Sequence, residues 1–124
     1  MLIDNLRLGQ QSRDQLIRLK RITGIENWNV LCRWALCLSL SDKNSPPQPS
    51  LTGETAVDIS WKTLTGDYAD VYLALLVQRA QEDSRPATRE TLSEILRIHV
   101  TRGIGFLTAR RQMNSIGDML EIAC

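Results

Sequence analysis

The side chains with the clearest chemical potential are basic, and they gather near the start of the chain. Residues 1–37 contain six Lys and Arg residues but only three acidic ones, whereas the whole chain has a formal net charge of +1. The residues best suited to contact phosphate groups are Arg7, Arg13, Arg18, Lys20 and Arg21. Phosphate contacts release counterions, so a local cluster can bind a polyanion although the chain is nearly neutral. The structural alternative is a solvated helix face, which is common.

Residues typical of catalysis or metal binding show no matching pattern. Cys32, Cys37 and Cys124 are odd in number and lack the spacing of a disulfide framework or a zinc site, which fits a reducing cytoplasm. The single histidine, His99, has no serine or cysteine motif to serve. The segment Gly103–Phe106 lacks the Gly-Lys-Ser/Thr of a phosphate loop. We therefore expect no metal, no cofactor and no enzymatic activity.

A short strand and a helix are expected to carry the basic residues. Over residues 2–8, leucines alternate with Asn5 and Arg7, which is the period of a strand with one polar face. Ser12–Thr23 favours a helix capped by its first residue, with leucines opposite the basic side chains, and Gly24 ends it. In a dimer, two such strands would pair into an antiparallel ribbon that fits the DNA major groove. An ordinary edge strand is the alternative.

The next predicted helix, Asn29–Leu40, is apolar around most of its circumference. Such a helix must be buried on most sides, and a chain of 124 residues has a modest core. We expect part of the cover to come from another subunit, with Leu31 and Leu38 at the interface and Gly24 allowing the tight turn. The chain is therefore predicted to be oligomeric.

The rest of the chain completes one mostly α domain over residues 1–124. It divides into a ribbon-helix-helix-like part, 1–41, a Pro-rich loop, 42–56, and a helical remainder, 57–124. Within the remainder the patterns predict a strand at 57–62 and a helix at 68–82 that is capped by Asp67. A further helix is predicted from Thr88 or Thr91 to Arg102, where Gly103 and Gly105 interrupt it, and a last helix at 115–122. No stretch is apolar enough to span a membrane, and no signal peptide is expected.

Two further features could contact nucleic acid. Trp28 lies at a turn and could stack on a base, whereas Trp34 and Trp61 are expected in the core. A second basic patch could form from Arg97, Arg102, Arg110 and Arg111, although a solvated surface is the favoured interpretation.

Three ordered sequence blocks resemble the DndE family of small DNA sulfur-modification proteins. The blocks are Asn29–Leu40, Trp61–Tyr68 and His99–Gly105, and the first, with its Leu-Cys-Arg and Ala-Leu-Cys-Leu-Ser-Leu runs, is the most specific. The resemblance implies a bacterial system that replaces a non-bridging phosphate oxygen of DNA with sulfur. It implies that companion proteins (a cysteine desulfurase, an iron–sulfur protein and an ATPase-like protein) perform the sulfur chemistry. It further implies a cytoplasmic, DNA-associated tetramer, similar in fold to ribbon-helix-helix proteins, that favours nicked double-stranded DNA.

Two rival functions stay open at this point. A ribbon-helix-helix repressor or antitoxin would recognise one operator through Asn5 and Arg7. The turn before Asn29 lacks the Ser/Thr-rich helix start frequent in that class. A protein–protein adaptor would not bind DNA at all.

Overall fold

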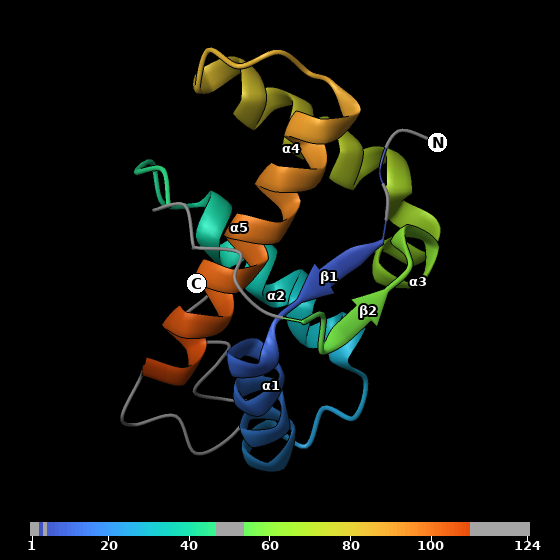
Figure 1. Ribbon diagram of the computed structural model, residues 1–124, viewed down its shortest axis with the longest axis vertical. Coiled ribbons are helices and arrows are strands. Elements are labelled where there is room, and N and C mark those ends of the chain that lie inside the picture. Colours follow the sequence, from blue (N-terminus) through green and yellow to red (C-terminus); the bar gives the residue numbers. More distant parts are fainter. Residues whose placement is uncertain (1–2, 4, 47–53, 110–124) are drawn as a thin grey trace.

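The computed structural model describes residue 3, residues 5–46 and residues 54–109, and in this part the chain is mostly helical, as predicted. Its elements, shown in Figure 1, are β1 (Leu6–Leu8), α1 (Gln10–Thr23), α2 (Trp28–Leu40), β2 (Val57–Ile59), α3 (Trp61–Thr65), the 3-10 turn η1 (Gly66–Tyr68), α4 (Ala69–Glu82) and α5 (Arg89–Ala109). The predicted helix at 115–122 lies outside the described residues.

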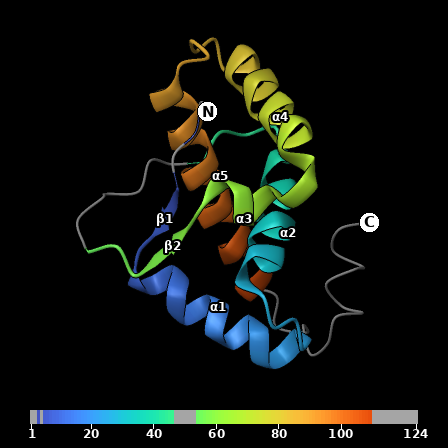
Figure 2. The same cartoon turned by 90° about the vertical axis from the view of Figure 1, so that its right-hand side faces the viewer.

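The centre of the fold is the packing of α5 against α2 (Figures 1 and 2). α5 continues without a break through Gly103 and Gly105, so the predicted interruption is wrong. The reason is close packing: a Cβ atom at Gly103 would overlap the carbonyl group of Ala35 on α2 and lie only 2.7 Å from its Cα. The absence of a side chain at Gly103 thus allows the backbones of α2 and α5 to come into contact, and this glycine lies inside a continuous helix.

The basic helix α1 follows its predicted pattern closely. On its apolar face, Leu16 and Leu19 are fully buried and Ile22 is half-buried against the core. It begins after Gly9, two residues earlier than predicted, and Ser12 is a buried position inside the helix, where it caps nothing. Gly24 ends the helix with φ +75°, and its N–H donates to the Lys20 carbonyl at 2.9 Å. This left-handed conformation favours glycine, so the predicted stop is confirmed.

The two strands form one antiparallel ribbon within a single chain. β1 pairs with β2 in the register Leu6 with Ile59, Arg7 with Asp58 and Leu8 with Val57. The predicted pairing with a second copy is thus replaced, on this edge of β1, by an intramolecular partner. The strand expected at 57–62 also ends early, because Ser60 caps α3 by accepting a hydrogen bond from the Thr63 N–H.

Much of the apolar surface of α2 is covered by its own chain. Leu31, Cys32 and Leu36 are fully buried, and α5 packs along this side of the helix. Leu38 is half-buried against the core. Leu31 therefore belongs to the subunit core, and its apolar character has an explanation that needs no second copy. The half-buried side of α2 is the part left for any partner.

Two helix starts differ slightly from expectation. Asp67 lies in η1 and does not cap α4, which begins after Tyr68. Before α5, the Thr88 hydroxyl accepts a hydrogen bond from the Thr91 N–H at 3.2 Å, so Thr88 is the capping residue of the two proposed. Among the described residues, no helix is both long and apolar enough to cross a membrane.

Candidate nucleic-acid interface

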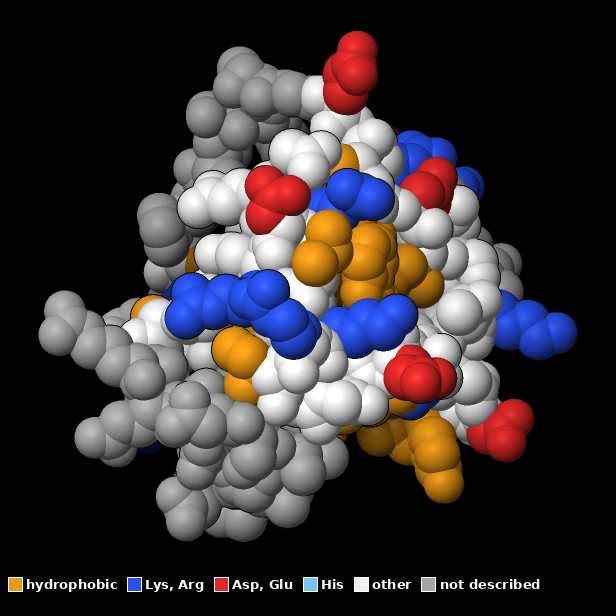
Figure 3. All heavy atoms as spheres, turned by 90° about the horizontal axis from the view of Figure 1, so that it is seen from below, with side chains coloured by type: hydrophobic (Ala, Val, Ile, Leu, Met, Phe, Trp, Pro, Cys, Tyr) orange, Lys and Arg blue, Asp and Glu red, His pale blue; other side chains and the backbone are white. Residues whose placement is uncertain are grey.

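The candidate interface is the solvent-facing side of α1, hereafter the basic face, formed by Arg13, Arg18, Lys20 and Arg21. All of these side chains are exposed, while the leucines of the same helix are buried. The helix period thus separates charge from core, as the sequence predicts. Within the described ranges, the ion pairs involve other basic residues, and none uses a residue of the basic face. Figure 3 shows Lys and Arg side chains in a band on the underside of the molecule, next to apolar side chains.

Arg7 differs from the basic face in its surroundings. It projects from β1 opposite Asp58 on β2, and its Nε lies 3.7 Å from a carboxylate oxygen of Asp58. The pair is solvated, with 60% and 47% of the two side chains exposed. Part of the positive charge of Arg7 is therefore neutralised locally, which makes it a weaker phosphate ligand than the residues of α1.

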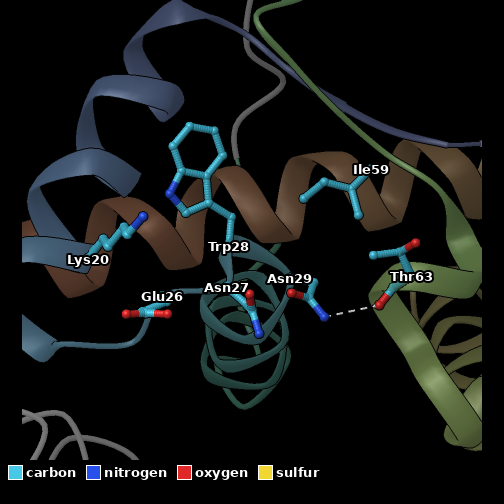
Figure 4. A pocket seen from close by; sticks show the side chains of 7 residues that line it. All are labelled: Lys20, Glu26, Asn27, Trp28, Asn29, Ile59 and Thr63. Carbon is cyan, nitrogen blue, oxygen red and sulfur yellow. Dashed lines mark hydrogen bonds between the residues drawn. The ribbon is translucent and has the colours of Figure 1, made fainter.

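A cleft opens beside the basic face, between α1 and the start of α2. It has a volume of about 380 Å³ and is lined by Lys20, Glu26, Asn27, Trp28, Asn29, Ile59 and Thr63. Figure 4 shows the Trp28 ring between the side chains of Lys20 and Ile59. The guanidinium of Arg13 lies 6.0 Å from the centre of this ring, and the Asn29 side-chain amide donates to the Thr63 carbonyl at 3.1 Å. Trp28 was recognisable in the sequence from its place at a turn, but the cleft combines residues from α1, α2, β2 and α3.

Trp28 itself is half-buried and packs against the core, and neither of the other two tryptophans is exposed. Trp61 is buried, as expected, although on a helix, and Trp34 is half-buried on α2. Trp34 therefore departs from the predicted core position, because only one side of α2 is fully covered.

Arg97 and Arg102, the two described residues of the predicted second basic patch, do not form an exposed basic surface. The guanidinium of Arg102 donates to the Ser39 hydroxyl and carbonyl, each at 2.8 Å, and to the Asn44 carbonyl at 2.6 Å. Burial lowers the pKa of Arg102. Arg102 thus fastens α5 to the end of α2, while Arg97 is half-buried and Arg110 and Arg111 lie outside the described residues.

A buried polar network next to Arg102 was not foreseen from the sequence. His99 and Ser39 are fully buried, and the Ser39 hydroxyl lies 2.8 Å from His99 Nδ1. Arg102 already donates to that hydroxyl, so the hydroxyl hydrogen can be donated to the neutral imidazole. Arg79 completes the network by donating to the carbonyls at the end of α2, those of Leu40, Asp42, Lys43 and Asn44.

The network is built to hold the structure together. Burial, followed by the charges of Arg79 and Arg102, lowers the pKa of His99 to about 4. The imidazole is therefore neutral at pH 7. Both the imidazole and Ser39 are closed off from solvent, whereas a catalytic nucleophile and its base must be reachable by a substrate. Ser39, Arg79 and His99 come from three different helices, and only Arg102 lies close to His99 in the sequence, one turn further along α5.

The described cysteines show the chemistry of inert thiols. Burial raises the pKa of Cys32 to about 12 and also raises the pKa of Cys37. The Cys32 thiol therefore stays protonated at pH 7 and is a weak nucleophile, and burial shifts Cys37 in the same direction. Within the described part of the chain, no three His, Cys, Asp or Glu residues are grouped so that they could hold a metal ion. Cys124 lies outside it.

The fold and the site define a small helical protein whose distinctive surface is a basic helix face beside an aromatic cleft. A family model described as DNA sulphur modification protein DndE matches residues 5–115, and the chain belongs to this family. The structure is similar to the crystal structure of DndE from Escherichia coli B7A, described as involved in DNA phosphorothioation modification. The TM-score is 0.70 at 26% sequence identity, over 86% of this chain and 98% of that one. No curated protein matches the sequence.

Proposed function

We propose that this chain is the non-catalytic DNA-binding subunit of a bacterial phosphorothioation machinery, and that it binds nicked double-stranded DNA through the basic face. The observation that carries the proposal is the cluster of exposed side chains on one side of α1, without acidic partners in the described ranges. Family membership supports the link to DNA sulfur modification. The protein would work in the cytoplasm with companion sulfur-modification proteins, which would supply the chemistry.

A gel-shift series with single charge removals tests this proposal. We expect Lys20→Ala and Arg21→Ala to weaken binding about equally for DNA of unrelated sequences, because phosphate contacts carry no base information. Each should also reduce the slope of log affinity against log salt concentration by roughly one. The measurement uses intact, nicked and single-stranded DNA of equal length, and nicked duplex should bind most tightly.

Lys43→Ala is the matched control. This residue is exposed and follows the end of α2, away from α1 (Figure 1). Removing its charge should leave the salt slope unchanged. If Asn5→Ala abolished binding to one palindromic operator while Lys20→Ala had little effect, the repressor would replace the present proposal. An absent DNA shift would favour the adaptor.

We also propose that the chain assembles as a homotetramer. Support comes from apolar side chains that the chain itself leaves uncovered: Tyr68 is 66% and Val71 is 55% exposed at the start of α4, and Leu38 is half-buried on α2. Light scattering at micromolar concentration should give a mass several times 14.0 kDa. Val71→Asp should reduce the mass, because an unpaired charge would be buried in the contact. Ala87→Asp, at an exposed loop position before α5, should leave the mass unchanged, and a folded wild-type monomer would refute the assembly.

A further inference from the structure

We propose that the cleft beside α1 receives one unpaired nucleotide of a DNA strand, with its base stacked on Trp28 and its phosphate on Lys20. The inference rests on the proposed function and adds a second mode of contact to it. The basic face can hold any phosphate backbone, whereas the cleft could distinguish an unpaired nucleotide from a paired one.

The size and the aromatic wall of the cleft favour a base. The cleft is open to solvent, and its volume of about 380 Å³ is near the lower end of the roughly 300 to 1,000 Å³ of small-molecule pockets, which is enough for one base. Trp28 and Ile59, which are both half-buried, supply the apolar surface, and Trp28 stands between Lys20 and Ile59 in Figure 4. Stacking on an aromatic ring is the common way in which proteins hold bases that have left the helical stack, because every base has a π-face.

The polar groups around the ring are distributed as a nucleotide requires. Lys20 supplies a positive charge on the α1 side of the cleft. The guanidinium of Arg13 lies over the Trp28 ring, 6.0 Å from its centre, so a base that stacks on this face takes the place of Arg13 and leaves its charge for the phosphate. Asn27 and Glu26 line the lower side in Figure 4, and their oxygens can accept hydrogen bonds from the edge of a base. The Glu26 carboxylate would repel a phosphate, which places the phosphate near Lys20 and the base edge near Glu26.

The position of the cleft favours a nucleotide within a strand over a free one. Lys20 belongs both to the cleft and to the basic face, which extends along α1 beyond the cleft. A strand with one nucleotide in the cleft can therefore continue along Arg13 and Arg21, and these contacts add to its affinity. A free nucleotide would use the cleft alone.

The test compares two duplexes of the same length, one fully paired and one with a single unpaired 2-aminopurine nucleotide. Wild-type protein should bind the second duplex roughly tenfold more tightly, which is within the range measured for stacking of one base. Stacking on Trp28 should also quench the 2-aminopurine fluorescence. Trp28→Leu, which keeps an apolar side chain, should bring the affinity ratio close to one and abolish the quenching.

Three controls make the outcome decisive. Trp34→Leu alters another half-buried tryptophan of α2 and should keep both the ratio and the quenching. Trp28→Phe keeps an aromatic face and should retain most of the preference, and circular dichroism should show all three variants folded. Free dAMP should bind at least tenfold more weakly than the unpaired duplex, since it lacks the contacts along α1.

The results separate the two proposals. If wild-type protein binds both duplexes equally, and Trp28→Leu does the same, the nucleotide cleft is wrong while DNA binding by the basic face stands. If neither wild-type protein nor Lys20→Ala binds either duplex above background, the proposed function itself fails. Binding of dAMP as tightly as the duplex would overturn the assignment to a strand.

Discussion

Gly103→Ala is expected to lower the free energy of unfolding by about 3 kcal/mol or more, at the upper end of the cost of overpacked sites. The added methyl group would overlap the Ala35 carbonyl, which is backbone and cannot turn away as a flexible side chain can. α5 would have to move away from α2, its principal packing partner. Urea denaturation followed by circular dichroism measures the loss.

Gly105 offers a matched control two residues further along the same helix. A Cβ atom there meets nothing within 4 Å, so Gly105→Ala removes only the conformational freedom of glycine. We expect it to stabilise the protein by up to about 1 kcal/mol. Equal effects of the two substitutions would contradict the backbone contact between α5 and α2. They would instead indicate that α5 and α2 leave room for a methyl group at position 103.

Lowering the pH from 7.5 to 5.5 is expected to reduce the free energy of unfolding by roughly 1 to 2 kcal/mol through His99 alone, and by roughly 2 to 4 kcal/mol by pH 4. The pKa of His99 falls from 6.5 to about 4 on folding, chiefly because of burial and then because of Arg79 and Arg102. The unfolded chain therefore binds the proton more readily. The stabilisation is present in full above pH 6.5 and is lost as the pH falls toward 4.

His99 is the single histidine of the chain, so this pH interval isolates it well. His99→Leu should be less stable at pH 7.5, because it loses the hydrogen bond with Ser39, but its stability should change little between pH 7.5 and 5.5. Urea titrations at several pH values give both curves. A wild-type curve that is flat over the same interval would contradict a buried neutral imidazole.

The sequence by itself predicted the local features well. The leucine period of α1, the apolar run of α2 and the left-handed stop at Gly24 depend on residues within a few positions of one another, and each is confirmed within two residues. The same short-range patterns separated the basic face from the buried face of α1. The three sequence blocks also led to the DndE family, which the family match confirms.

Only the tertiary structure decided the contacts between distant segments. The partner of β1 is β2, some fifty residues further along, because Leu6 and Leu8 complete the core of their own chain. Gly103 appeared to be a helix break, since a glycine lowers helix propensity wherever it stands, but the backbone of α2 requires one at that position. Helix propensity depends on a single residue, whereas packing depends on both of the segments that meet, here α2 and α5.

The candidate site divides in the same way. The sequence identified the exposed cations, because helix periodicity alone sets which side of α1 faces solvent. It named Trp28 but not the cleft, whose walls come from several elements, and it gave no sign of the network of Ser39, Arg79 and His99. A buried polar side chain is stabilised by a hydrogen-bond partner, which His99 Nδ1 finds in Ser39, whereas the buried His99 Nε2 has none. The packing of α2, α4 and α5 determines which partner is within reach.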